Sequence, residues 1–189
     1  MGSVVHGRVH RPGLAECGGG RKKGGPGEPP DHALGRSRGG FGTKLHLVAC
    51  GRAVPLGAHI SPGQDHESTH VEQALGSVAL PYAWTEPWYI PRKVAGDKAY
   101  TGERIRGMLE ILGAEPVIAH QSKETPKPWE KPFDRKAYRR RNVIERVVGW
   151  IKECRRVATR FEKLALNYLA MVKLAMIHRC LRISFSYRT

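Results

Sequence analysis

The residues from Tyr138 to Arg156, YRRRNVIERVVGWIKECRR, predict one helix with two opposed faces. At about 100° per residue, one face collects mostly polar and basic side chains: Tyr138, Arg141, Glu145, Gly149, Lys152 and Arg156. The opposite face is apolar and comprises Val143, Ile144, Val147, Trp150, Ile151 and Cys154. Such a stripe seats a helix on a hydrophobic core. A single carboxylate, Glu145, therefore projects from a basic ridge, and Gly149 leaves room beside it for another backbone.

The charge of the chain points to a polyanionic partner. The net charge is +15, and residues 131–189 carry 16 Lys/Arg against 4 Asp/Glu. A basic half of this kind is typical of nucleic-acid binding, where phosphates are neutralised. No lipidation signal supports a membrane surface as the partner. The apolar segment 164–183 is interrupted by polar and charged residues, so it predicts a buried helix rather than a membrane span.

Cysteine usage indicates a reducing compartment. Cys17, Cys50, Cys154 and Cys180 lie far apart and form no C-x-x-C pair. This spacing favours reduced thiols over a zinc site or a disulfide framework. Since the sequence also shows no secretory signal, we expect a cytoplasmic protein.

Residues 1–42 form a Gly/Pro-rich basic segment that we expect to be flexible. Thirteen of the 22 glycines lie there, and only Gly2–His10 alternates like a strand or the end of one. The segment either touches DNA through its basic residues or is a flexible surface insertion, and the sequence favours neither.

From Thr43 onward, a hairpin is predicted by the strand patterns of residues 43–49 and 53–60, and a short helix follows near residues 68–75. Asp65 and His66 lie in the intervening loop. They are conceivable metal ligands, but polar turns commonly hold such residues, and we favour a turn.

The order of elements around Asp97 predicts an α/β crossover. A short strand at residues 93–96 precedes Asp97, a helix spans about 101–112 and ends at Gly113, and a second strand occupies 115–119. This order places Asp97 at the carboxyl end of a sheet strand, where ligands gather in open α/β sheets. A mostly apolar helix is predicted at residues 163–181.

Several stretches resemble DDE transposases of bacterial insertion sequences, in particular the insertion-sequence-five group. The pattern Y-x-x-R-x-x-x-E-x-x-x-x-x-x-K at residues 138–152 resembles their signature. The further stretches are GRSRGGFGTKLHLVACGRAVPLGAHISPGQDHES, VAGDKAYTG and RRVATRFEKLALNYLAMVKLAMI. The resemblance covers nearly the whole chain from about Arg36.

This resemblance implies an α/β, RNase H-like fold, a mixed sheet flanked by helices. It also implies that Asp97 and Glu145 are the second and third catalytic acids, which bind Mg²⁺ or Mn²⁺. Residues expected to contact or orient double-stranded DNA are Tyr138, Arg141, Asn142, Arg146, Lys152 and Arg156. The expected partners are the ends of an insertion element, target DNA and further copies of the chain, with no membrane.

The chain departs from the family pattern at its first residues. In relatives the first catalytic Asp precedes a segment that corresponds to Gly2-Ser3-Val4-Val5, so its place falls on Met1. We therefore expect an N-terminally truncated chain with its first strand largely missing and a partial catalytic domain at 43–189. Such a chain would be defective alone. The alternative is a DNA-binding remnant without catalysis that modulates full-length transposase. A generic basic nucleic-acid module is disfavoured by the ordered pair Asp97 and Glu145.

Overall fold

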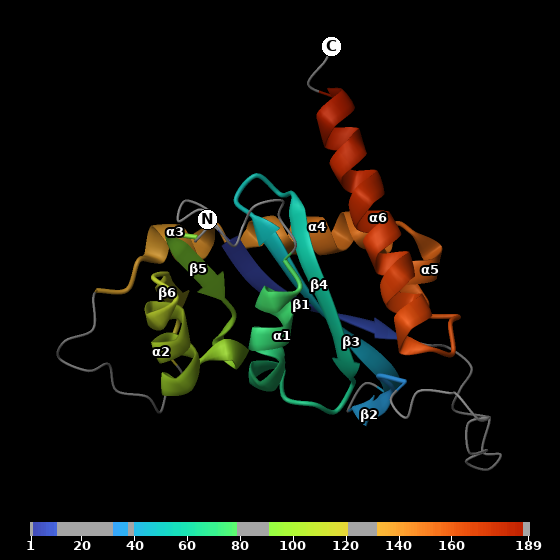
Figure 1. Cartoon of the computed structure of the whole chain (residues 1–189), viewed down its shortest axis with the longest axis horizontal. Coiled ribbons are helices and arrows are strands. Elements are labelled where there is room, and N and C mark those ends of the chain that lie inside the picture. Colours follow the sequence, from blue (N-terminus) through green and yellow to red (C-terminus); the bar gives the residue numbers. More distant parts are fainter. Residues whose placement is uncertain (1, 11–31, 38–39, 79–90, 121–131, 187–189) are drawn as a thin grey trace.

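The computed structural model describes residues 2–10, 32–37, 40–78, 91–120 and 132–186. They form one mixed sheet with helices on both faces (Figure 1). Its strands are β1 (Gly2–His10), β2 (Gly35–Ser37), β3 (Gly40–Cys50), β4 (Pro55–Pro62), β5 (Lys93–Gly96) and β6 (Glu115–Ile118). Its helices are η1 (Glu67–His70), α1 (Val71–Gly76), η3 (Lys98–Tyr100), α2 (Glu103–Ile111), α3 (Arg135–Arg139), α4 (Asn142–Lys152), α5 (Arg155–Ala158) and α6 (Ala165–Ser186).

Strand β1 lies in the middle of the sheet. The strand order is β2-β3-β1-β5-β6, and β4 also pairs with β3. Strands β1, β5 and β6 run parallel to one another, whereas β3 is antiparallel to the strands that it pairs with. The prediction that the first strand would be largely missing is wrong, because β1 spans nine residues and pairs with β3 along its whole length. Residues 11–31, most of the segment predicted to be flexible, lie outside the described residues.

The alternation of β3 divides the interior into two cores. Leu45, Leu47 and Ala49 pack in a cluster with apolar residues of α4, α5 and α6. Val48 belongs to a second cluster, which includes residues of α1, β5, α2 and β6 and the side chain of Tyr100. Successive side chains of a strand point to opposite faces of its sheet, so β3 supplies both cores.

Most of the predicted elements are confirmed. Strands β3 and β4 form the expected hairpin, β5 and β6 flank α2 as a parallel crossover, and Gly113 ends α2 with a positive φ of 78°. Glycine adopts this backbone conformation without steric cost. The helix predicted at residues 163–181 is observed at Ala165–Ser186. No helix within the described residues is long and apolar enough to span a membrane.

The prediction of one continuous helix from Tyr138 to Arg156 is wrong in detail, because the structure divides it into α3, α4 and α5. Between α3 and α4, Arg140 and Arg141 keep helical dihedrals, but the amides of Val143 and Ile144 bond three residues back. The junction is therefore a tightened helical turn rather than a break. At Cys154 the backbone is extended (φ −73°, ψ 108°), and the helix does stop there.

One buried arginine ties the segment after α5 to the sheet. Arg160 is 1% exposed, and its guanidinium donates to the carbonyls of His32, Ala33, Glu162 and Lys163 and to the hydroxyl of Thr43 on β3. It also lies over the ring of Tyr168 of α6, 5.1 Å from the ring centre. These contacts satisfy a charge that would otherwise be costly to bury.

Candidate active site

Asp97 directly follows β5, as the crossover predicts. Its Oδ1 accepts a hydrogen bond from the amide of Lys98 (2.6 Å), so the side chain caps η3, a 3₁₀ helix of one turn. The side chain remains 46% exposed. A carboxylate at this place can reach a ligand beyond the sheet edge.

Glu145 approaches from α4, and Arg141 connects it with Asp97. Arg141 contacts Oδ1 of Asp97 at 3.0 Å through one terminal nitrogen and Oε1 of Glu145 at 3.7 Å through the other. The Glu145 side chain is 62% exposed, whereas Arg141 is 24% exposed. The structure thus brings the two predicted acids to the two ends of one guanidinium, although they are 48 positions apart in the sequence.

Tyr138 connects Arg141 with the sheet. The guanidinium carbon of Arg141 lies 5.0 Å from the centre of the Tyr138 ring, a distance suited to a cation–π contact. The Tyr138 ring lies 5.2 Å from that of Phe133 and packs beside Ala95 and Val117 of the sheet. The Tyr, Arg and Glu of the sequence signature are therefore one contacting set beside Asp97.

Helix α3, which carries Tyr138, is fastened by Asp134. The Asp134 carboxylate caps α3 by accepting from the Ala137 amide (2.8 Å), and it contacts Lys93 Nζ of β5 at 2.8 Å. The Ala137 amide first, and then Lys93, holds the pKa of Asp134 below its ordinary value. Lys93 also contacts Glu115 of β6 (3.0 Å), so α3 is joined to both strands.

The other residues predicted to bind DNA lie along the same helices but outside this contacting set. Asn142 and Arg146 are exposed on α4, and Lys152 at its end is half-buried. Arg156 belongs to α5, beyond the bend at Cys154, and contacts Glu162 at 3.3 Å. The exposed basic surface therefore continues away from Asp97 along α4 and α5.

The donor set of Asp97 and Glu145 fits a hard divalent cation. Carboxylate oxygens are the ligands that Mg²⁺ and Mn²⁺ prefer. The positive guanidinium of Arg141 already contacts both carboxylates, where a cation would otherwise lie. Within the described residues, however, no three histidine, cysteine or acidic side chains form a group that could hold a metal ion.

The strand register bears on the expected first acid. Gly2 pairs with Val94 and Val4 pairs with Gly96, so Asp97 comes after the β5 residue that faces Val4. Gly2 is therefore offset from Asp97 by three positions along the strands, roughly 10 Å at about 3.3 Å per residue. In this register, the start of β1 is not level with Asp97.

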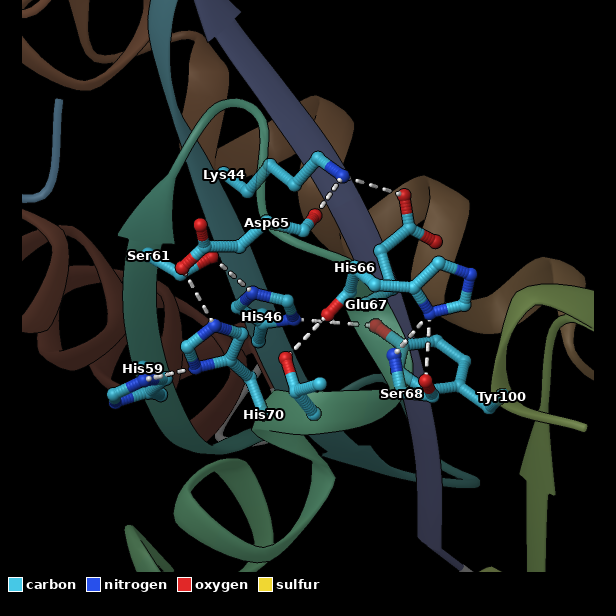
Figure 2. Close-up of polar contacts among 11 residues, drawn as sticks. Lys44, His46, His59, Ser61, Asp65, His66, Glu67, Ser68, His70 and Tyr100 are labelled. Atoms are coloured by element: carbon cyan, nitrogen blue, oxygen red, sulfur yellow. Dashed lines mark hydrogen bonds and ion pairs between the residues drawn. The ribbon is translucent and has the colours of Figure 1, made fainter. Parts of the chain in front are cut away.

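A buried polar cluster beside η1 was not predicted from the sequence (Figure 2). His46 of β3 is fully buried; its Nε2 lies 2.8 Å from the Ser61 hydroxyl and its Nδ1 lies 3.3 Å from that of Tyr100. Burial raises the pKa of the Tyr100 phenol above its ordinary value. A histidine within the apolar run LHLVA was the available signal.

The loop with Asp65 and His66 is a hydrogen-bonded turn, as favoured from the sequence. His66 Nδ1 lies 2.6 Å from the Ser68 hydroxyl, and Asp65 Oδ2 lies 3.1 Å from Nε2 of His70. His70 in turn contacts His59 of β4 through its Nδ1 (3.2 Å). Figure 2 shows this chain of rings beside His46.

Comparison with known proteins identifies the family to which this chain belongs. Residues 9–180 match the family described as Transposase DDE domain, and the chain belongs to this family. A particular relative is the putative transposase for insertion sequence element IS402 of Burkholderia cepacia. It is 30% identical over 162 residues, which cover 85% of this chain and 70% of the relative. No solved structure gives a significant match.

Proposed function

We propose that this chain is the catalytic domain of an insertion-sequence transposase of the insertion-sequence-five group. It would cut and join DNA at the ends of its element by metal-dependent phosphodiester cleavage and strand transfer, in the cytoplasm. The observation that carries the proposal is the convergence of Asp97 and Glu145 on Arg141, in a chain that belongs to the DDE family.

The strand arrangement supports an RNase H-like assignment within this proposal. The sheet is mixed: β3 is antiparallel to β1 and β4, whereas β1, β5 and β6 are parallel, and this supports the mixed sheet that the resemblance implies. Its first acid is expected on β1, the second after β5 and the third on α4. We assign Asp97 and Glu145 to the second and third places.

In the proposed reaction, Asp97 and Glu145 hold Mg²⁺ or Mn²⁺. When bound there, such an ion would supply Lewis-acid chemistry for phosphodiester cleavage. Because clustered carboxylates repel one another, the positive charge of Arg141, which contacts both, offsets that repulsion. When a phosphodiester approaches, the Arg141 guanidinium can turn from the carboxylates to a phosphate oxygen, a geometry that Arg favours. Gly149, beside which nothing lies within 4 Å of a Cβ, leaves space for the DNA backbone one turn beyond Glu145.

A cleavage experiment tests the proposed reaction. With Mg²⁺ or Mn²⁺ and duplexes that carry the element ends, we expect the 189-residue chain to bind but not to nick, since the candidate site has two acids, Asp97 and Glu145. A chain extended so that an aspartate stands directly before Gly2 is expected to nick, provided that β1 moves four positions along β5. Such an even shift keeps the same residues on each face of the sheet.

The outcome depends on two substitutions. In the extended chain, Asp97→Ala or Glu145→Ala is expected to abolish nicking. The same two substitutions are also made in the 189-residue chain. If that chain nicks DNA and both of its variants still nick, the active site lies elsewhere. If the 189-residue chain nicks DNA and both of its variants do not, a third acid is already present, and Asp65 is the first residue to substitute in the search for it.

The second candidate function is a DNA-binding protein without catalysis that modulates a full-length transposase. The β1–β5 register favours it, since the start of β1 is not level with Asp97. Suppose that the extended chain binds the element ends without nicking them and also inhibits a full-length relative. The modulating function would then replace the catalytic one.

DNA binding should depend on the basic surface of α4. The Arg146→Ala/Lys152→Ala double variant is expected to weaken binding of a short duplex by roughly 10- to 100-fold at low salt. It should also reduce the slope of log K against log salt by about 2, since each phosphate contact contributes about 0.9. Fluorescence anisotropy at several NaCl concentrations measures both quantities.

The matched control removes the same charge elsewhere. Arg52 lies in the β3–β4 turn, and Arg104 of α2 contacts Glu72 and the Ser68 carbonyl. The Arg52→Ala/Arg104→Ala variant is expected to change the salt slope by well under 1. Equal losses in the two double variants would show that binding follows net charge rather than a site on α4.

We also propose that the chain acts on DNA as a homo-oligomer. Helix α6 leaves large apolar side chains exposed along one stripe, comprising Leu174, Ile177, Leu181 and Phe185. In Figure 1 its carboxyl-terminal half extends beyond the sheet. Analytical ultracentrifugation with and without duplex DNA tests this proposal, and a monomer under both conditions would contradict it.

A further inference from the structure

The buried hydroxyl–imidazole–hydroxyl chain of Ser61, His46 and Tyr100 is not used by the proposed reaction. All three residues are at most 1% exposed. His46 Nε2 lies 2.8 Å from Ser61 Oγ, and His46 Nδ1 lies 3.3 Å from the Tyr100 hydroxyl. Polar groups are costly to bury unless they are hydrogen-bonded, so this chain fixes the three side chains relative to one another across β3 and β4 (Figure 2).

Tyr100 connects this chain with Asp97. It is the last residue of η3, and its amide donates to the Asp97 carbonyl at 2.9 Å. At the other end of the turn, the Asp97 carboxylate accepts from Lys98. A three-residue 3₁₀ turn has poor hydrogen-bond geometry and does not hold its own shape. Its position must therefore come from an anchor outside the turn.

The Tyr100 side chain is that anchor. Its ring is buried with Val48, Val94 and Ile118 of the sheet and with Ile105 of α2, which fixes how deeply η3 sits. Ring burial alone leaves the phenol free to slide within an apolar site, whereas a hydrogen bond is directional. The bond to His46 ties the hydroxyl to β3, near the middle of the sheet.

The imidazole suits this linking role. A neutral histidine has one ring nitrogen that donates and one that accepts. Both partners are hydroxyls, which can donate or accept, so either tautomer of His46 satisfies the whole chain. His46 can therefore link β4 to η3 without leaving a buried polar atom unpaired.

We propose that Tyr100 and His46 are positioning residues that hold the η3 turn so that the Asp97 carboxylate faces Glu145. This inference rests on the proposed metal-binding role of Asp97 and Glu145. Both side chains are buried, so their effect on Asp97 is exerted through the backbone of η3.

The test measures Mn²⁺ affinity rather than cleavage. The full chain, labelled with ¹⁵N, is titrated with Mn²⁺, and paramagnetic broadening of the Lys98 and Glu145 amide signals gives the affinity at this place. Tyr100→Phe keeps the ring and removes the hydroxyl. We expect it to weaken Mn²⁺ binding roughly three- to tenfold, the effect of one lost hydrogen bond on an aligned ligand.

Tyr168 provides a matched control in the other core. It is also fully buried, and its hydroxyl donates to the Val157 carbonyl at 2.9 Å. Tyr168→Phe should lower the melting temperature much as Tyr100→Phe does but leave Mn²⁺ affinity unchanged. Equal Mn²⁺ affinities in the two variants would overturn the inference.

Two further variants complete the test. His46→Gln retains groups that can hydrogen-bond and is expected to bind Mn²⁺ more tightly than His46→Leu; equal affinities would count against a positioning role. Asp97→Asn distinguishes the metal-binding role of Asp97 from the positioning role of Tyr100. If it leaves the broadening unchanged, the proposed metal site is wrong. If it abolishes the broadening but Tyr100→Phe has no effect, only the positioning role is wrong.

Discussion

Replacing Arg160 with alanine is expected to lower the free energy of unfolding by roughly 3–5 kcal/mol. The guanidinium donates to four backbone carbonyls and to Thr43, so its removal leaves several buried acceptors without a donor. It also removes the contact with the Tyr168 ring. For a chain of this length, the melting temperature should fall by roughly 6–20 °C. Thermal unfolding followed by circular dichroism measures the change.

Arg155 serves as the control for Arg160. It is exposed at the start of α5, five positions away. Arg155→Ala is expected to change the free energy of unfolding by less than about 0.5 kcal/mol. Arg160→Lys should recover little stability, because an ammonium cannot reproduce the planar fork that reaches separate acceptors. A fall in melting temperature shared by Arg155→Ala and Arg160→Ala would show that charge, not the bonding pattern, stabilises this region.

The metal-site variants are expected to change Mn²⁺ affinity in opposite directions. Asp97→Asn and Glu145→Gln should each weaken binding by roughly tenfold or more, since each removes one of the two carboxylates proposed as ligands. Arg141→Gln should strengthen it severalfold, because the guanidinium contacts both carboxylates and carries the charge that a cation would replace. The Mn²⁺ titration described for Tyr100 measures all three.

Arg140 provides a control that distinguishes the contact of Arg141 with the carboxylates from the effect of net charge on Mn²⁺ affinity. It is exposed in the turn between α3 and α4, and its side chain is not the one that bridges Asp97 and Glu145. Arg140→Gln removes the same charge one residue away and should leave Mn²⁺ affinity nearly unchanged. If it strengthens binding as much as Arg141→Gln does, the basic surface as a whole, and not the bridging guanidinium, opposes the cation.

Local sequence patterns were enough to predict where the acids lie. The strand that ends before Asp97 and the helical stripe around Glu145 are both short-range signals of period and polarity. Hydrogen bonding over long sequence distances was not predictable in this way. Arg160 meets His32 and His46 meets Tyr100 only after the sheet has formed. An arginine in a loop and a histidine in a strand carry no mark of such partners.

The division of the predicted helix into α3, α4 and α5 also arises from contacts between residues far apart in the sequence. Hydrophobic period indicates helix across Cys154, because its residues keep an apolar face there. The extended backbone at Cys154 arises where α5 turns to pack against α6 and the sheet, with Val157 fully buried. Tertiary packing overrides a continuous local pattern at that point.

The central place of β1 has a consequence for the growing polypeptide. One of its neighbours, β5, is completed about 85 residues later, which takes roughly 4–17 s at ribosomal rates of about 5–20 residues per second. During this time one edge of β1 has no strand to pair with, and unpaired edges are sites of association between chains. Pairing across so long a separation also slows folding. The nascent chain is therefore most exposed to aggregation, or to capture by a chaperone, before β5 has been synthesised.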